Sequence, residues 1–432
     1  MPPPPGRLSR RQLLSTAAGL GLAAVAAPLA GCSRTVSISA DPDELVLWYW
    51  NRSISPQLLD RAAQQIPGTN RRLRADVIGG TFDTKLRTSL AGQAYIPDIT
   101  AVNSNASLYF PNEDLFVDLN TLGAEKHKPD FFPWKWQLGT TPTGRMCFWP
   151  MDTGPTGLYY RADLLADAGL PSEPDEVGES VRTWDALVEL GAKLRAKSDT
   201  ALIANATMIF TQYINASPER YFDSSDRPLY AEPNSAVRQA WDTAVSAIRS
   251  KITGNLQTGT DQNSGWVSGR VAGHVEAVWW AEILADTAPD TKGKWRLASQ
   301  PGKPGNSGGS FLAVPHTCKD PEAAFAFISW LTTPENQART FNDVQLFPST
   351  PASFTGGQMT SETGFFGSQG PLAFFSKAAE SVPITYVSPY EAQTTAFATE
   401  LANVEAGGKD AEQAWDEAVE LTDKILAKRG AL

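Results

Sequence analysis

The residues of this chain that could do chemistry fall into three groups, and the first would supply a serine nucleophile. Gly305-Asn306-Ser307-Gly308-Gly309 fits the G-x-S-x-G pattern, in which a serine lies on a turn between a strand and a helix. Here a Pro/Gly-rich loop precedes the serine and a strand-like run follows it. No Asp or Glu stands between Ser307 and His316 to orient that histidine. We therefore expect no enzyme, and an envelope hydrolase is the least favoured alternative.

Paired acids form the second group, and they could serve as glycosidase carboxylates or calcium ligands. Asp41, Asp43 and Glu44 stand together, as do Asp223 and Asp226, but the flanks of both sets are typical of turns. The Cys and His residues are scattered without the spacing of a zinc site. We expect neither a metal nor any other cofactor.

Cys147 and Cys318 could be free, buried side chains or could form a disulfide with each other. Cys147 lies in an apolar, strand-like run and has the setting of a buried small side chain. A disulfide between Cys147 and Cys318 is permitted in an oxidising compartment, and the sequence does not decide whether it forms.

The third group is aromatic and could bind a sugar ring. The chain has 13 tryptophans, and a flat ring with a polar edge is a natural platform for a carbohydrate. Trp279-Trp280 follows the turn at residues 269–273 and lies close to Glu282. Adjacent side chains cannot both face the same way, so we expect one ring to pack and the other to stack on a ligand. The alternative is that both rings lie in a core.

The first 32 residues have the pattern of an exported lipoprotein. Ser9-Arg10-Arg11-Gln12-Leu13-Leu14 is a twin-arginine (Tat) export signal, and Leu29-Ala30-Gly31-Cys32 has the form of a lipobox. We expect residues 1–31 to be a signal peptide and residues 32–44 to be a tether. Cys32 would carry acyl chains such as palmitate, which hold the protein stably on the outer face of the cell membrane. A transmembrane helix is the alternative, but Pro28 interrupts a weakly hydrophobic run.

The net charge of the chain argues against partners that bind through basic residues. The whole chain carries 37 basic and 47 acidic residues, and the leader holds three arginines and no acid, which leaves a net charge of −13. Such a balance argues against nucleic acid and against an electrostatic membrane patch. About 400 residues remain, enough for two domains, and we expect a monomer.

The elements that must position these residues alternate between strand and helix. An apolar run at residues 45–50 predicts a buried strand, and strands at 73–78 and 98–102 follow with helices between them. This order predicts βαβ units and a mostly parallel sheet. Further strands are expected at 294–298 and 310–315, with further helices at 183–196, 235–251, 321–331 and 411–429.

Taken in order, the segments resemble the family 1 extracellular solute-binding proteins of ABC transporters, the carbohydrate-binding class that includes maltose-binding protein. The resemblance covers residues 45–426, and it is carried by LVLWYW, GGTFDTKLRTSLAGQ, PDITAVN, EDLFVDL, FWPMDTGPTGLYYRADLLADAGLP, TWDALVEL, GWVSGRVAGHVEAVWW, GGSFLAVP, PEAAFAFISWLTTPENQ and GGKDAEQAWDEAVE. The chain departs from the family at Ala272-Gly273, where Ala-Met is common. Residues 355–370, rich in Gly, Ser and Phe, have no assigned role.

The resemblance implies a type II periplasmic-binding-protein fold, with two α/β lobes joined by three crossings and the ligand between them. Lobe 1 would comprise residues 45–151 and 295–340, and lobe 2 residues 156–294 and 344–432. Ligand-binding side chains are expected at the carboxyl ends of strands and at the crossings. The expected set is Trp50, Asn51, Arg52, Thr81, Asp83, Asn103, Asn105, Asp152, Thr153, Trp279, Trp280, Gly309, Ser310 and Tyr390.

The implied function is that of a lipid-anchored protein that binds a mono- or oligosaccharide by hinge closure and delivers it to the permease of an ABC importer. Asp, Asn and Arg side chains suit adjacent sugar hydroxyls. The main alternative keeps the fold but binds a glycerophosphodiester or another polar solute. Arg52, Lys85 and Arg87 could serve such an anion, whereas Asp83 and Asp152 argue against it. Which sugar is bound does not carry over from the family.

Overall fold

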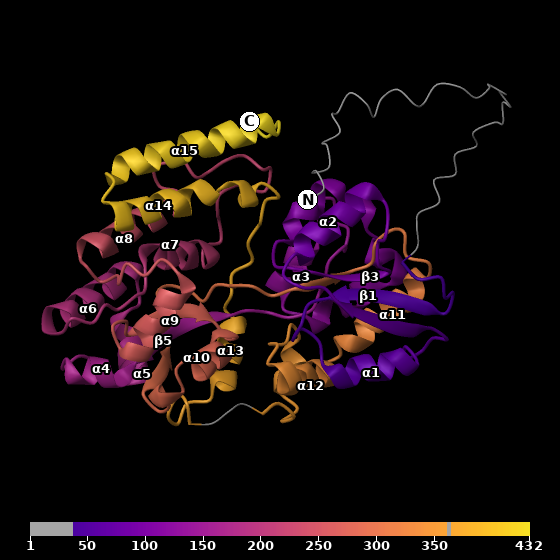
Figure 1. The fold of residues 1–432 in the computed structure, drawn as a ribbon, viewed down its shortest axis with the longest axis horizontal. Coiled ribbons are helices and arrows are strands. Elements are labelled where there is room, and N and C mark those ends of the chain that lie inside the picture. Colours follow the sequence, from indigo (N-terminus) through magenta and orange to yellow (C-terminus); the bar gives the residue numbers. More distant parts are fainter. Residues whose placement is uncertain (1–37, 361–363) are drawn as a thin grey trace, which may run out of the picture. The chain divides into compact units, whose positions relative to one another are not determined.

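The computed structural model describes residues 38–360 and 364–432 (Figure 1). The expected signal peptide, the expected lipidation site Cys32 and the first part of the expected tether lie outside these residues. Within the described part of the chain, none of the helices combines the length and the apolar character that crossing a membrane requires.

The first sheet has five strands in the order β2-β1-β3-β8-β4. The three strands β1, β2 and β3 run parallel, and β8 pairs antiparallel with both β3 and β4. β1 is an inner strand, and its residues Leu45 to Trp48 are apolar and buried, as expected of a strand covered on both faces. The strands are β1 (Glu44–Tyr49), β2 (Arg72–Val77), β3 (Ile99–Val102), β4 (Trp149–Pro150) and β8 (Phe311–Ala313).

Helices join these strands into the βαβ units that the alternating pattern predicts. We call this sheet and its helices the first lobe; its core contains Leu47, Phe148, Leu312 and Phe327. Pro at the start of α1 and Asp320 at the start of α11 favour helix initiation there. The elements are α1 (Pro56–Gln64), α2 (Phe82–Gly92), α3 (Pro133–Gly139), α11 (Pro321–Leu331) and the 3-10 helices η1 (Ala106–Leu115), η2 (Leu119–Leu122) and η3 (Ala124–Asp130).

The second sheet has three strands in the order β6-β5-β7, and both pairings are antiparallel. They are β5 (Thr156–Arg161), β6 (Gly273–Ala277) and β7 (Trp295–Ala298). Because β7 pairs with β5, the expected start of the second part of lobe 1 at residue 295 is wrong. The chain returns to the first sheet only at β8.

Helices surround the second sheet, and together they form the second lobe. α14 and α15 pack against each other, and α14 also packs on α7 and α8 (Figure 1). The helices are α4 (Ala162–Asp167), α5 (Pro174–Ser180), α6 (Trp184–Lys197), α7 (Ala206–Asn215), α8 (Ala236–Arg249), α9 (Gly259–Ser268), α10 (Trp280–Thr287), α13 (Pro371–Ala379), α14 (Thr395–Gly407) and α15 (Ala411–Lys428), with the 3-10 helices η4 (Pro289–Thr291) and η6 (Glu391–Gln393). α12 (Pro334–Val344) and η5 (Pro351–Phe354) follow α11 of the first lobe and precede α13 of the second, and they pack on each other.

Three segments connect the lobes, and they hydrogen-bond to one another; we call them the hinge segments, residues 151–155, 305–310 and 347–349. The amide of Met151 donates to the carbonyl oxygen of Ser310 (3.1 Å), and that of Thr153 donates to Phe347 (2.8 Å). Gly309 has a φ of +78°, and a Cβ at this position would stand 2.9 Å from the carbonyl oxygen of Asp152. Only glycine therefore fits where the first two segments meet.

Candidate ligand-binding site

In the first lobe, polar and aromatic side chains gather where β1, β2 and β3 end. Trp50 is half-buried, and its ring meets Phe82 edge-on with the ring centres 5.1 Å apart. Asp83 lies in the first turn of α2. Burial raises the pKa of Tyr109 to about 12, and the charge of Asp83 adds to this shift. Tyr109, which the sequence interpretation missed, is therefore a neighbour of Asp83 at this edge.

The remaining expected side chains of this edge differ in exposure. Asn51, Thr81 and Asn103 are exposed, and Oδ1 of Asn103 accepts from the amide of Ser104 (3.1 Å). Oδ1 of Asn105 is buried and has no hydrogen-bond partner within residues 38–360 and 364–432. A buried acceptor without a partner is costly, so Asn105 is the residue of this group best suited to receive a ligand hydroxyl.

Two contacts bring this edge against the second lobe. Arg52, in the loop after β1, forms an ion pair with Glu282 of α10. The hydroxyl of Ser107 donates to the carbonyl oxygen of Ser388 (3.3 Å). The strand ends of the first lobe thus face α10 and the segment that leads to Tyr390. Tyr390 itself is half-buried, and its ring lies 6.2 Å from that of Phe222.

The two adjacent tryptophans have different environments. Trp279 is 38% exposed, and its Nε1 donates to the carbonyl oxygen of Ser307 (3.0 Å). Trp280 is 3% exposed and packs among Tyr159, Trp266 and His274, with ring centres 4.4–4.9 Å away. Because successive side chains at the start of a helix point in different directions, only Trp279 is available to a ligand. The burial of Trp280 disfavours its expected contact with a ligand, which stays a prediction.

Beside Trp279 lies a polar group that the sequence interpretation missed. Oε2 of Glu276, on β6, accepts from Nε2 of Gln212 (3.1 Å), whose Oε1 accepts from Asn215 (3.3 Å). Burial raises the pKa of Glu276, and hydrogen bonds from Ser307, Ala277 and Gln212 oppose that shift. Ser307 contacts both Glu276 and Trp279, so the side chains of these two residues lie close together. The signal in the sequence was a carboxylate within the buried run Gly273–Ala277.

The expected ligand contacts at the crossings are instead used within the hinge segments. Asp152 is 6% exposed, and its Oδ1 accepts from the amide of Ser310 (2.7 Å). The hydroxyl of Thr153 donates to the carbonyl oxygen of Pro348 (2.8 Å), and Gly309 packs against Asp152. All four residues are buried, and Asp152, Thr153 and Ser310 are already bonded within the hinge segments. This disfavours the expected contacts of Asp152, Thr153, Gly309 and Ser310 with a ligand, which stay predictions.

The hinge segments also enclose a lysine that the sequence interpretation missed. Lys135 of α3 is fully buried, and its Nζ lies 3.4 Å from the centre of the Phe311 ring. Nζ has no hydrogen-bond partner in the described residues. Burial lowers the pKa of Lys135 and raises that of Asp152, while the charge of each opposes the shift of the other. The two residues form a buried pair at the crossing.

In the described residues, the other candidate groups lack the arrangement of a metal site or of a serine on a strand-to-helix turn. No group of three or more His, Cys, Asp or Glu side chains in the described part of the chain could hold a metal. Cys147 and Cys318 are free and buried, and burial raises the pKa of each thiol to about 12. Ser307 precedes strand β8 rather than a helix, and His316 lies against the carbonyl oxygen of Leu115.

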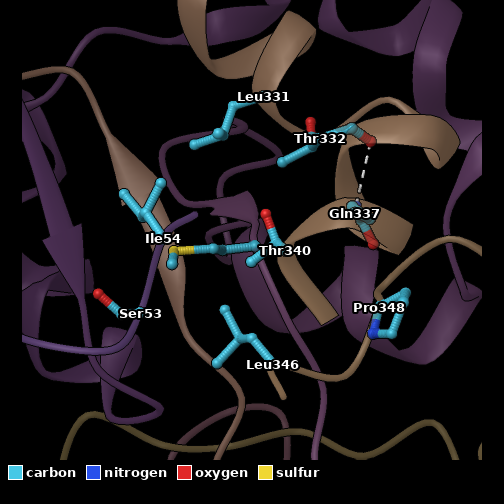
Figure 2. Close-up of a pocket in the computed structure, with 9 residues that line it drawn as sticks. Ser53, Ile54, Leu331, Thr332, Gln337, Thr340, Leu346 and Pro348 are labelled. Atoms are coloured by element: carbon cyan, nitrogen blue, oxygen red, sulfur yellow. Dashed lines mark hydrogen bonds between the residues drawn. The ribbon is translucent and has the colours of Figure 1, made fainter. Parts of the chain in front are cut away.

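Figure 2 shows a small cavity beside the hinge segments, lined by Ile54, Leu331, Thr332, Gln337 and Thr340 among others. Nε2 of Gln337 donates to the carbonyl oxygen of Thr332 (3.1 Å). The cavity holds about 10 Å³, and about 10–15 Å³ is needed for a single water molecule. It is therefore too small for a sugar.

Two α/β lobes, linked by three hydrogen-bonded segments and in contact through strand ends, are the architecture of type II periplasmic-binding proteins. A sequence model described as "bacterial extracellular solute-binding protein" matches residues 73–338. The chain belongs to this family, and the expected fold class is confirmed. The expectation of mostly parallel sheets was wrong, because only the pairings of β1 with β2 and β3 are parallel and the other four are antiparallel.

Individual relatives agree with this assignment. The chain is 27% identical over 292 residues to the lactose-binding protein of Rhizobium radiobacter, and the match spans 64% of this chain and 66% of that protein. The crystal structure of an extracellular solute-binding protein of family 1 shares 29% identity, with a TM-score of 0.83 over 88% of this chain and 99% of the other.

Two more distant structures share the fold. The galacto-N-biose-/lacto-N-biose I-binding protein of Bifidobacterium longum, in complex with lacto-N-biose, is 19% identical, with a TM-score of 0.73 over 90% of this chain and 98% of the other. The sugar-binding protein MalE of Xanthomonas citri is 18% identical, with a TM-score of 0.73 over 89% and 98%.

Proposed function

We propose that this protein is the sugar-binding component of an ABC importer, and that it binds a mono- or oligosaccharide between the two lobes. The observation that carries the proposal is the exposed ring of Trp279 beside the carboxylate of Glu276, both in contact with Ser307. An indole ring covers the apolar face of a pyranose, and a carboxylate accepts from its hydroxyls. Asn105 and Asp83 would serve the ligand from the first lobe.

A β-galactoside such as lactose is the first ligand to test. The curated relative is a lactose-binding protein, and one structure of the same fold holds lacto-N-biose. The acids near the site also bear on the alternative ligand class. Asp83 and Glu276 would repel a phosphodiester, and the nearby cation Arg52 is already paired with Glu282.

Hinge closure and delivery to a permease complete the proposal. A sugar that contacts both lobes favours the arrangement in which they are in contact, and this is the state that a permease would read. The leader of the chain supports a lipid anchor at Cys32 on the outer face of the membrane.

A thermal-shift panel tests the ligand class. Lactose, galactose, maltose and glycerophosphocholine are each added to the purified protein, and the melting temperature is measured. The proposal predicts an increase with at least one sugar and none with glycerophosphocholine, because a ligand that binds only the folded state stabilises it. An increase with the phosphodiester alone would favour the alternative ligand, and turnover of any compound would indicate an enzyme.

A further inference from the structure

A second cavity borders Trp279 on the side of the second lobe. It lies between α10, the end of α12 and the segment that begins α13, and it has a volume of about 280 Å³. Its walls include Trp279, Ala285, Phe341, Phe365, Phe366 and Leu372. Two of the lining residues, Phe365 and Phe366, thus come from the Gly/Ser/Phe-rich stretch at residues 355–370, to which the sequence alone assigns no role.

The lining of this cavity does not suit a sugar ring. Its polar side chains are Glu282, Asp286 and Gln345. Glu282 is paired with Arg52, and Nε2 of Gln345 donates to the carbonyl oxygen of Phe341 (3.0 Å). A pyranose would place several hydroxyls where few hydrogen-bond partners are available, and each unpaired hydroxyl would lose affinity through its desolvation. An apolar group gains affinity in the same place from the area that it buries.

The volume fits one aromatic ring with a substituent. An apolar cavity of about 150 Å³ holds benzene, and 280 Å³ leaves room for more. The acidic side chains of the lining limit which substituent the cavity accepts. Glu282 and Asp286 lie one helical turn apart on α10. Arg52 already offsets the charge of Glu282, so Asp286 is the acid that disfavours an aglycone with a carboxylate or phosphate.

Trp279 connects this cavity to the proposed sugar site. Its indole N–H donates to Ser307, which also contacts Glu276, while the same side chain forms part of the cavity wall. A sugar stacked on Trp279 would therefore have its substituent at the mouth of the cavity. We propose that the protein takes glycosides with an uncharged aromatic aglycone, and that the aglycone occupies this cavity. This inference rests on the proposed function.

Paired glycosides test the proposal. Calorimetric titration compares methyl and phenyl β-D-galactopyranoside, or the corresponding glucopyranosides if maltose is the sugar that stabilises the protein. Because the phenyl group buries an apolar surface that the methyl group lacks, we expect the phenyl glycoside to bind about tenfold more tightly or better. In Ala285→Phe the new ring fills the cavity, and the ratio of the two affinities should fall towards one. Ala427→Phe, at an exposed position of α15, is the matched control and should keep the ratio.

The outcomes separate this inference from the function on which it rests. If a sugar binds but the phenyl glycoside gains nothing over the methyl glycoside, the aglycone site is refuted and the sugar site stands. If the gain persists in Ala285→Phe, the aromatic ring binds elsewhere and the assignment of this cavity is refuted. If no sugar or glycoside binds, the proposed function fails and this inference fails with it.

Discussion

Trp279 and Trp280 are neighbours in sequence, but only the first is exposed to a ligand. Replacing Trp279 by Ala should weaken sugar binding about tenfold or more, since stacking on the ring is worth about 1–2 kcal/mol. The free energy of unfolding should change little, because the side chain is 38% exposed. Calorimetry measures the affinity, and chemical denaturation measures the stability.

Trp280→Ala is the matched control for this prediction. Its ring is 3% exposed among other aromatic rings, so its removal should cost about 3–5 kcal/mol of stability. The folded fraction should still bind sugar. Normal affinity in Trp279→Ala, with weak affinity in the folded fraction of Trp280→Ala, would contradict our assignment of the two rings.

His274 should make the fold sensitive to acid. It is buried against Trp266 and Trp280, and burial lowers its pKa to about 3. In the unfolded chain a histidine has a pKa of about 6.5. Between these values the unfolded state binds the extra proton, so this histidine lowers the unfolding free energy by about 1.4 kcal/mol for each pH unit below about 6.5.

Urea unfolding at pH 7, 5.5 and 4.5 measures this effect. His274→Phe should flatten the dependence of stability on pH, whereas His127→Gln, with a half-buried side chain at the surface, should leave it close to that of the wild type. If His274→Phe shows the same slope as the wild type, His274 does not remain neutral in the folded protein.

Some side chains of the site escape prediction because their environments depend on distant parts of the chain. Asp152 looks like a ligand contact in its own loop, but Ser310, to which it is bonded, lies 158 residues away. Glu276 is recognisable as a carboxylate in a strand, yet its position beside Trp279 depends on Ser307 and Gln212. The exposure of one tryptophan and the burial of the other could be expected from helix geometry alone.

Among the elements, the hinge segments depend on the buried pair of Lys135 and Asp152. Asp152→Ala leaves the lysine buried without its counter-charge, and we expect a loss of about 3–5 kcal/mol in the free energy of unfolding. Lys135→Met combined with Asp152→Ala should recover part of that loss, because no charge then remains inside. Denaturation of the four proteins of this double-mutant cycle gives the coupling energy.

A stability of Asp152→Ala equal to that of the wild type, together with weakened sugar binding, would contradict this assignment. It would instead restore the role of ligand contact that the sequence indicates for Asp152. An additive cycle would likewise show that the two residues do not interact in the hinge.

The first sheet could be predicted from local sequence, and the second could not. Leu45 to Trp48 form a continuous apolar run, and the helices that follow β1 and β2 make the βαβ pattern recognisable. β7 has a strand sequence too, but nothing in Trp295–Ala298 indicates that it pairs with β5, more than a hundred residues earlier. Strand pairing between distant segments is decided by tertiary packing, which is why the lobe boundary at residue 295 was misplaced.

For the whole molecule, the lipobox predicts attachment to a membrane through lipid at Cys32. Cys32→Ala removes the thiol that would carry the acyl chains, and we expect the protein to move from the membrane fraction to the soluble fraction of cells that express it. Fractionation followed by immunoblotting measures the distribution. Cys318→Ala is a control that keeps the lipobox intact. A Cys32→Ala protein that stays fully bound to membranes would indicate a transmembrane leader instead.

The central claim is that the two lobes bind a sugar, and calorimetric titration of the purified protein with lactose, maltose and glycerophosphocholine tests it most directly. The account predicts saturable one-to-one binding of at least one sugar, with heat released and no heat from the phosphodiester. In Arg52→Ala, which lacks the contact with Glu282 across the lobes, the same sugar should bind more weakly. Saturable binding of glycerophosphocholine without binding of either sugar would contradict the account.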